Sequence, residues 1–265
     1  MIINNHFPVL VQLLPKNDPR RSKWVKSLKK RPPPWDKGKS KETDLRVKKI
    51  SDTFKRKKID NFSKWRDEMK RCGKIRSIYP DFVKSNDLAF LIGITLGDGN
   101  IQNFPRTDRL LISLNAKYPG LVNDVALVVS KIFEKDAVVK KVKGSDCVRV
   151  WVYQKNISNR LGIPSGDRRK SVLEIPGWIW ESDDFLIWYL KGLFEAEGSL
   201  SIHLPSYTYN FAFSNRNEKL LDNVKRGLIK LGFHPEVRSN AIRLRKKAEV
   251  ECFKKLIDFR NYSAG

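Results

Sequence analysis

Two acidic residues, Asp98 and Glu197, each stand near the end of an apolar stretch and each precede a glycine. The first stretch reads LIGITLGDG and the second reads LKGLFEAEG. Gly99 can take the left-handed conformation that commonly ends a helix. A carboxylate at a helix C-terminus is unfavourable, because unpaired carbonyls give that end partial negative charge. Two such carboxylates, brought together, are therefore candidates to bind a divalent cation such as Mg²⁺ through their oxygens.

Small residues inside both stretches indicate how the two acids could meet. Gly93 and Gly97 are four residues apart, and so are Gly192 and Ala196. Residues at this spacing share one face of a helix, and small side chains there let two helix backbones approach closely. If the two helices pack along these faces, their C-terminal ends come together and so do the two acids.

The chain repeats one order of elements twice. Residues 86–164 and residues 183–265 each read as a helix, two strands, a helix, two strands and a final helix, joined by a linker over residues 165–182. A repeat of this kind predicts two similar halves related by a pseudo-twofold axis. The expected fold class is α+β, with two αββαββα halves that each hold an antiparallel sheet.

Alternation along the strands predicts a cationic outer face on each sheet. Arg149, Trp151 and Tyr153 alternate with valines, while Arg243 and Arg245 alternate with aliphatic residues. Cations and aromatic side chains on an open sheet suit contact with DNA. An ordinary half-solvated sheet is the alternative, and it would carry mixed charge. Acids are scarce in these strands, so DNA contact is favoured.

The composition also favours a polyanionic partner. The 265-residue chain holds 53 Lys and Arg against 29 Asp and Glu, a net charge of +24, and such an excess points first to nucleic acid. Residues 16–76 alone hold 24 Lys or Arg and 8 Asp or Glu. We therefore predict that residues 1–85 form a basic N-terminal arm, with one or two short helices after the stretch RPPPW, that contacts DNA. A solvated basic tail and an RNA-binding addition are the alternatives.

Other residue types exclude several classes of protein. The three cysteines and the three histidines show no metal-ligand spacing, so we expect neither a zinc site nor a disulfide framework. No apolar stretch is long enough to span a membrane, and the N-terminus lacks the basic residues and cleavage site of a signal peptide. We expect a soluble, intracellular protein with no membrane partner.

The nine-residue stretches Leu91–Gly99 and Leu190–Gly198 resemble the two motifs of the LAGLIDADG homing endonuclease family. The resemblance covers roughly residues 86–260 and implies a monomer whose halves arose by gene duplication, with saddle-shaped sheets. Leu96 departs from the motif, because an acid is common at this sixth position, whereas the second motif keeps Glu195. In the family the metal ligand is the eighth position, so this departure does not affect the metal ligands.

The resemblance implies a metal-dependent hydrolysis of DNA. Asp98 and Glu197, at the eighth motif position, would hold Mg²⁺ at the two scissile phosphates, and Mn²⁺ can substitute. The metal would activate water and stabilise the leaving 3′ oxygen. Family members cut both strands across the minor groove and read the flanking major grooves with their sheets.

Four further residues are catalytic candidates by the same resemblance. Lys155 and Lys247 stand where the family usually has a lysine, at the end of the fourth strand and close to the active site; Lys246 could replace the latter, and each could instead be a solvated lysine. Asn115 and Asn215 end the second strand of each half, where polar residues order water in the family. Either asparagine could also be a helix N-cap.

The linker adds three candidate phosphate contacts, Arg168, Arg169 and Lys170. Together these observations predict an intron-encoded, site-specific endonuclease that cuts double-stranded DNA. Two alternatives keep the same fold: an RNA maturase whose partner is the RNA of its host intron, and a DNA-binding regulator that does not cleave. The presence of both motif acids favours the nuclease.

Overall fold

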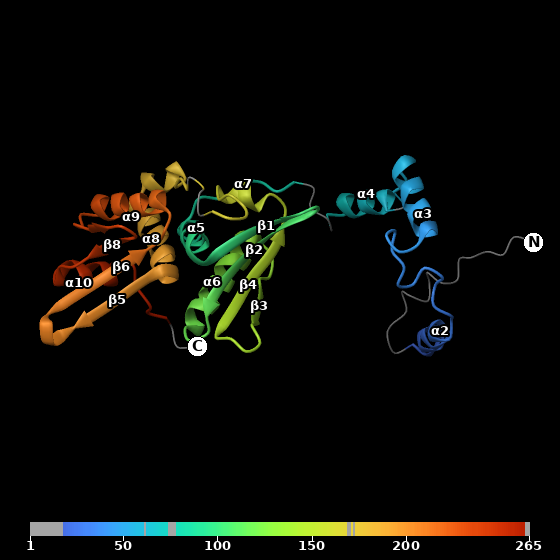
Figure 1. Cartoon of the computed structure of the whole chain (residues 1–265), viewed down its shortest axis with the longest axis horizontal. Helices are drawn as coiled ribbons and strands as arrows, with labels where there is room; N and C mark the ends of the chain where they lie inside the picture. Colours follow the sequence, from blue (N-terminus) through green and yellow to red (C-terminus); the bar gives the residue numbers. More distant parts are fainter. Residues whose placement is uncertain (1–17, 61, 74–77, 169–170, 172, 263–265) are drawn as a thin grey trace, which may run out of the picture. The chain divides into compact units, whose positions relative to one another are not determined.

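The computed structural model describes residues 18–60, 62–73, 78–168, 171 and 173–262 (Figure 1). The chain forms two compact units, Met1–Ser77 and Ile78–Gly265. Of the predicted basic arm, residues 1–77 belong to the first unit and residues 78–85 to the second, where Phe82 packs against Phe133 of the first half. Both motif helices lie in the second unit. No helix in the described ranges is long and apolar enough to cross a membrane.

The described part of the first unit contains three helices, α2 (Pro19–Lys29), α3 (Leu45–Arg56) and α4 (Ser63–Arg71). Helices α3 and α4 are the short helices predicted after RPPPW, whereas α2 was not predicted. Asp18 and Asp44 cap α2 and α3, since each carboxylate accepts the backbone N–H two residues on at 2.8 Å. No residue of α3 or α4 is buried, so these two helices expose both their charged and their apolar side chains.

The first half of the second unit follows the predicted order of elements. Its elements are α5 (Asn86–Asp98), β1 (Gly99–Phe104), β2 (Thr107–Asn115), α6 (Pro119–Phe133), β3 (Val138–Lys141), β4 (Cys147–Gln154) and α7 (Ile157–Leu161). The four strands form an antiparallel sheet, sheet A, in the order β1-β2-β4-β3.

The second half repeats this order after a short 3₁₀ helix, η1 (Gly177–Glu181). Its elements are α8 (Asp183–Glu197), β5 (Gly198–His203), η2 (Leu204–Ser206), β6 (Thr208–Ser214), α9 (Glu218–Lys230), β7 (Glu236–Arg238), β8 (Ala241–Leu244) and α10 (Lys247–Leu256). Sheet B has the order β5-β6-β8-β7 and is also antiparallel. The predicted α+β class and the repeated αββαββα halves are confirmed.

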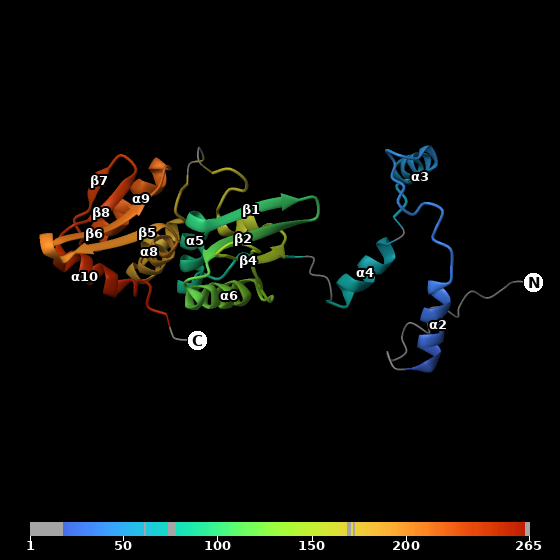
Figure 2. The same cartoon turned by 60° about the horizontal axis from the view of Figure 1, so that its bottom comes forward.

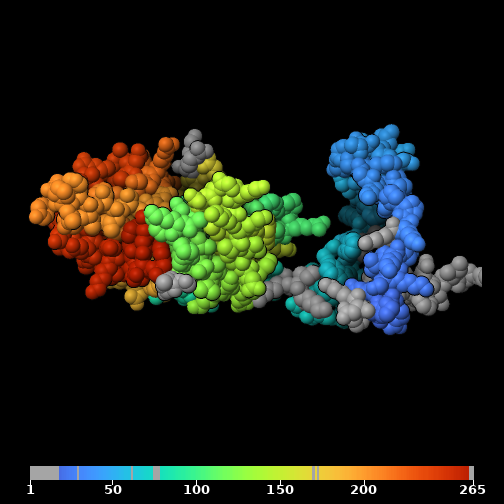
Figure 3. All heavy atoms as spheres, turned by 90° about the horizontal axis from the view of Figure 1, so that it is seen from below, coloured from blue at the N-terminus to red at the C-terminus, as the bar shows by residue number. Residues whose placement is uncertain are grey.

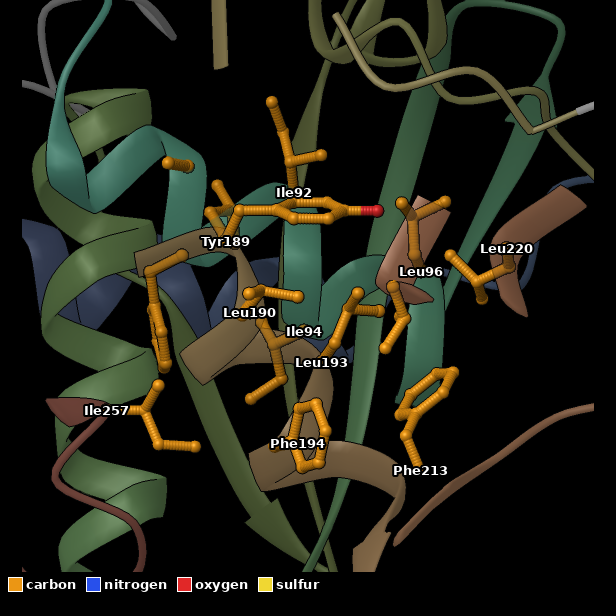
Figure 4. Close-up of a cluster of buried hydrophobic side chains, with 14 of the residues drawn as sticks. Ile92, Ile94, Leu96, Tyr189, Leu190, Leu193, Phe194, Phe213, Leu220 and Ile257 are labelled. Atoms are coloured by element: carbon orange, nitrogen blue, oxygen red, sulfur yellow. The ribbon is translucent and has the colours of Figure 1, made fainter. Parts of the chain in front are cut away.

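Helices α5 and α8 lie side by side between the two sheets (Figures 1 and 2). Their apolar side chains belong to one buried core that includes both halves. Figure 4 shows part of it, with Ile92, Ile94 and Leu96 of α5 beside Tyr189, Leu190 and Leu193 of α8. Because one core holds both helices, the ends that carry the motif acids are fixed relative to each other.

Candidate active site

The motif helices approach so closely that only small residues fit between them. A Cβ atom added to Gly93 would lie within 3.0 Å of the carbonyl oxygen of Tyr189, and one added to Gly97 would lie equally close to Cβ of Ala196. Gly192 makes the same close approach to the backbone of α5. The structure thus places all four predicted interface residues in the contact between α5 and α8.

The glycines after the two acids have an extended conformation. Gly99 has φ −92° and ψ 159°, and Gly198 has φ −75° and ψ 140°. The expectation that Gly99 is left-handed is therefore wrong, because a strand begins at this residue. Glycine is required here for another reason: a Cβ atom on Gly99 would lie 2.6 Å from Cα of Thr95 in the last turn of α5.

The carboxyl groups of Asp98 and Glu197 come together at the ends of α5 and α8. Partial burial and, to a smaller extent, the negative charge of Glu197 together raise the pKa of Asp98 to about 7. Burial also raises the pKa of Glu197. A Cβ atom on Gly97, the residue before Asp98, would lie 3.6 Å from Cγ of Glu197, so the two predicted metal ligands lie in one region.

The two predicted asparagines make different contacts. Asn215 donates from Nδ2 to Oε2 of Glu197 at 2.6 Å, and this hydrogen bond lowers the pKa of Glu197 against the effect of burial. Asn115 accepts the backbone N–H of Lys117 at 2.9 Å and forms a turn before α6. No side chain in the described ranges donates a hydrogen bond to Asp98. Within the described ranges, Glu197 therefore accepts a hydrogen bond from a side chain, whereas Asp98 accepts none.

Arg168 was predicted as a phosphate contact, and the structure places its guanidinium at the end of α5. Its half-buried guanidinium donates to two backbone carbonyls at the end of α5, from Nη1 to Thr95 at 2.9 Å and from Nη2 to Gly99. Its positive charge lowers the pKa of Glu197. Arg168 is thus the cation that offsets the negative end of the first motif helix. The other two candidate contacts of the linker, Arg169 and Lys170, lie outside the described residues.

Arg260 caps the second motif helix in the same way. Its Nη2 donates to the carbonyl of Gly198 at 3.1 Å, and its backbone N–H donates to Glu195 at 2.8 Å. Tyr262 donates from its hydroxyl to the same Glu195 carboxylate. The sixth-position acid of the second motif therefore anchors the end of the chain. Arg260 was not predicted, since no local pattern in the sequence pairs it with a residue more than sixty positions away.

The anchored C-terminal segment also contacts the first half. The Arg260 guanidinium lies 4.8 Å from the ring centroid of Tyr118, and the rings of Tyr118 and Tyr262 are 6.2 Å apart. In Figure 3 the red atoms near the C-terminus accordingly meet the green atoms of the first half. This contact adds to the core in holding the halves together around the acids.

The two predicted catalytic lysines lie away from the acids. Lys155 follows Gln154, which pairs with Asp108, whereas Gly99 pairs with Ile112. These pairs are four residues apart on β2, roughly 13 Å along the strand. The expectation that Lys155 lies close to the active site is therefore wrong, because β4 runs away from that end of sheet A.

Lys247 of the second half also lies away from the motif acid of its half, Glu197. Its Nζ lies 5.8 Å from the ring centroid of Tyr209. Tyr209 pairs with Ile202, at the far end of β5 from Gly198. Its alternative, Lys246, forms an ion pair with Glu249 at 3.2 Å on α10. Neither lysine lies beside Glu197.

A cavity of about 880 Å³ opens beside Glu197. Its lining includes residues from both halves, among them Asn100 of β1, Arg168 of the linker, and Asn215 and Arg216 before α9. Two acids, two arginines and four asparagines thus line the same space. Such a polar lining suits a charged, hydrogen-bonding ligand more than an apolar one.

The donor set beside the cavity fits a magnesium ion. Within the described ranges, no three or more His, Cys, Asp or Glu residues form a metal-binding group. The chain itself thus offers two carboxylates, Asp98 and Glu197. Mg²⁺ usually binds through one or two carboxylates and completes its shell with water and substrate phosphate oxygens.

The outer face of sheet A is basic, as the strand pattern predicted. Arg149 pairs with Lys140 across β3 and β4, so two positive side chains lie opposite each other on this face. Neither has an acidic partner in the described part of the chain. Like charges at this separation are unfavourable unless an anion lies between them. A hollow of about 440 Å³ on this face is lined in part by Lys140, Arg149 and Trp151. Tyr153 lies farther along β4 and is exposed.

The outer face of sheet B carries a mixed pattern. Arg245 is exposed, whereas Arg243 is only 21% exposed and binds Glu236 at 2.9 Å. Arg238 lies 3.7 Å from the same carboxylate. The two sheets therefore have the same topology but a different charge distribution.

The structure has two motif helices in contact and an acid at the end of each, which is the arrangement expected from the resemblance to the LAGLIDADG family. Residues 184–256 match the model of the family described as LAGLIDADG-like domain. The matched range includes the second motif, Leu190–Gly198, and the family resemblance is confirmed over that range.

The solved structures to which this chain is similar include the homing endonuclease I-DmoI and a DUF199/WhiA protein. The structure of the homing endonuclease I-DmoI in complex with DNA and Mn is 16% identical, covers 65% of this chain and 96% of that chain, and has a TM-score of 0.46. The N-terminal LAGLIDADG domain of DUF199/WhiA is 15% identical, covers 68% and 86%, and has a TM-score of 0.44. No curated protein matches the sequence.

Proposed function

We propose that this protein is an intron-encoded homing endonuclease that acts as a monomer and cuts both strands of a specific DNA site with Mg²⁺. One observation carries the proposal. The half-buried carboxyl groups of Asp98 and Glu197 end two touching helices, and the charge of Glu197 repels that of Asp98. Burial and repulsion make this arrangement costly without a cation, so a functional divalent metal accounts for it. Mn²⁺ can take the place of Mg²⁺.

Each residue near the metal ligands has a separate role. Asp98 and Glu197 hold the ion, which when bound supplies Lewis acidity and lowers the pKa of water. Asn215 fixes the direction of the Glu197 carboxylate. Arg168 holds the end of α5 and places positive charge beside the cavity, where it favours a phosphate. Hydrolysis adds water across a P–O3′ bond and leaves a 5′ phosphate and a 3′ hydroxyl.

DNA contact is assigned to the outer sheet faces and the basic arm. Arg149 and Lys140 on sheet A form no ion pair with an acid among the described residues, so they suit phosphates. The aromatic rings of Trp151 and Tyr153 can pack against sugars or bases. The arm supports the same partner because α3 and α4 expose a dense set of lysines and arginines.

The direct test is cleavage of a plasmid that carries the insertion site of the gene itself. We expect linear product with Mg²⁺, and none with Ca²⁺, for the wild-type protein. Asp98→Asn and Glu197→Gln should each abolish cutting while they preserve binding of the site in Ca²⁺. Asp87→Asn is a matched control, because Asp87 lies on the first turn of the same helix and pairs with Lys131 at the surface.

Two other outcomes would replace the proposal. Tight binding of the plasmid site without cutting under any metal would assign the protein as a DNA-binding regulator. Preferential binding of the host intron RNA, with faster splicing in its presence, would assign it as a maturase. Cleavage that survives both acid substitutions would show that the hydrolytic site lies elsewhere.

A further inference from the structure

An arginine on the outer face of sheet B is held by a neighbouring glutamate. Arg243 on β8 and Glu236 on β7 are directly paired across the strands. Both Nε and Nη2 of Arg243 donate to Oε2 of Glu236, at 3.0 and 2.9 Å. Two hydrogen bonds to one carboxylate fix the plane and direction of the guanidinium.

The contacts that hold Arg243 leave its outer edge available. A guanidinium has five N–H groups in a planar fork. Two of them point to Glu236, so Nη1 and the second hydrogen of Nη2 remain. This remaining edge matches the O6 and N7 acceptors of guanine in the major groove. A fixed guanidinium also loses less conformational freedom on binding than a free side chain does.

The equivalent place in sheet A has no such pair. Gly99 pairs with Ile112 and Gly198 pairs with Phe213, which gives a common starting point for both sheets. We then compare the two sheets one residue along the strands from these pairs. At this level Trp151 lies opposite Val138 in sheet A, whereas Arg243 lies opposite Glu236 in sheet B. The two halves therefore present different chemistry to their half-sites at the same distance from the motif ends.

A second polar group on the same face of sheet B lacks a partner. Oδ1 of Asn210 is buried and accepts no hydrogen bond within the described ranges. Asn210 lies two residues from Ala212, which pairs with Arg243, so both side chains are on one face of the sheet. A buried polar atom without a partner is costly, and a bound polar ligand would remove this cost.

From these contacts we propose that Arg243 reads a guanine in the major groove and that Glu236 is a specificity-determining residue, which acts by fixing the direction of Arg243. The inference rests on the proposed DNA-binding function and deepens it. The Glu236 carboxylate also neutralises part of the positive charge of Arg243 and Arg238. This weakens the attraction of the two arginines to DNA phosphates, which is independent of the base sequence.

The test is a binding selection with the full chain on a pool of duplex DNA with a randomised central 30 base pairs, in Ca²⁺. The wild-type pool should show a strong guanine preference at one position in the half-site of the second half. Arg243→Ala and Arg243→Lys should both remove that preference and weaken binding of the selected site about tenfold to a hundredfold. The lysine variant keeps the charge, so it separates base reading from general attraction.

The glutamate variant gives the distinguishing result. Glu236→Gln should lower the guanine preference at the same position, while it strengthens binding to unselected DNA and steepens the dependence of affinity on salt. Glu251→Gln is the matched control, since it makes the same charge change on the exposed surface of α10. It should leave the preference unchanged.

Two results would overturn the inference. The assignment fails if the guanine preference survives in both arginine variants, or if Glu236→Gln weakens binding to every sequence equally while its thermal melting is normal. A wild-type protein that enriches no DNA would overturn the proposed function itself, and this outcome differs from a wild-type preference that the variants leave intact.

Discussion

The side-chain amide of Asn215 donates a 2.6 Å hydrogen bond to Glu197, whereas Asn115 makes no such bond to Asp98. The two motif acids are therefore unequal, although they end equivalent helices. Glu197 has a hydrogen-bond donor and a nearby cation, Arg168. No side chain in the described ranges donates a hydrogen bond to Asp98, and burial together with the charge of Glu197 raises its pKa to about 7. In the protein without metal, the charged form of Asp98 is thus electrostatically unfavourable, more so than that of Glu197.

Because the charged Asp98 carboxylate is unfavourable in the folded protein, Asp98→Asn should stabilise the metal-free protein at alkaline pH. The pKa of Asp98 rises from 3.8 to about 7 on folding, so the folded state binds the proton more tightly. Stability is then lost as the pH rises from about 4 to 7, because the folded state must bury a charge. The neutral amide avoids this cost, on the order of 2–4 kcal/mol.

Thermal melting in EDTA measures the effect. The variant should melt several degrees above the wild-type protein at pH 8, and the difference should shrink at pH 5. Asp87→Asn controls for the loss of any acid from α5. An Asp98→Asn melting temperature at or below that of the wild type at pH 8 would contradict the prediction.

The same raised pKa predicts a pH dependence of cleavage. Metal ligands must be deprotonated, so protons compete with Mg²⁺ at Asp98 below pH 7. The single-turnover cleavage rate at subsaturating Mg²⁺ should rise about tenfold per pH unit up to about pH 7 and then level off. Higher Mg²⁺ should move the midpoint to lower pH. A flat profile between pH 5.5 and 8 would mean that Asp98 does not titrate in the step that limits cleavage.

The two asparagines provide a matched pair of variants. Each accepts a backbone N–H two residues on, but only Asn215 also contacts a motif acid. Asn215→Ala should therefore lower the cleavage rate about 10- to 100-fold, an effect typical of groups that orient a metal ligand. Asn115→Ala should change it less than about threefold. Equal losses in both variants, with unchanged DNA affinity, would show that Asn115 also acts in the site.

Much of the site could be predicted because its signals are local. The small residues at fourfold spacing and the acid before each glycine are short patterns, and periodicity alone places them on helix faces. The repeated order of elements then brings the two patterns together. These features led to Asp98, Glu197 and the contact at Gly93 and Gly97 without any knowledge of pairing.

The predictions were wrong or incomplete for residues whose position depends on contacts between residues far apart in the sequence. The direction of β4 relative to the acids follows from its register with β2, which a single sequence does not reveal, so Lys155 was placed at the wrong end. The cap at Thr95 comes from Arg168, 73 residues away. A run of basic residues marked the linker as important but could not distinguish a phosphate contact from a helix cap.

The close contact of the motif helices predicts that a single methyl group is destabilising. A Cβ atom on Gly93 would meet the backbone of α8 within 3.0 Å, and backbone cannot rotate away as a side chain can. Gly93→Ala should cost about 3 kcal/mol or more in unfolding free energy, or prevent folding. Gly177→Ala is the control, since its added Cβ would meet nothing within 4 Å. Urea unfolding that shows equal stability for both variants would contradict the contact.

The basic arm predicts a specific change in salt dependence. Residues 16–76 hold 24 of the 53 Lys and Arg of the chain, and the first unit is compact on its own. A chain that begins at Ile78 should keep the melting temperature of the second unit, because its core lies entirely within residues 88–259. Its affinity for the cleavage site should fall at least tenfold at low salt, and the slope of log affinity against log salt should flatten, because fewer counterions are released. The same slope for both chains would show that the arm does not contact the DNA backbone.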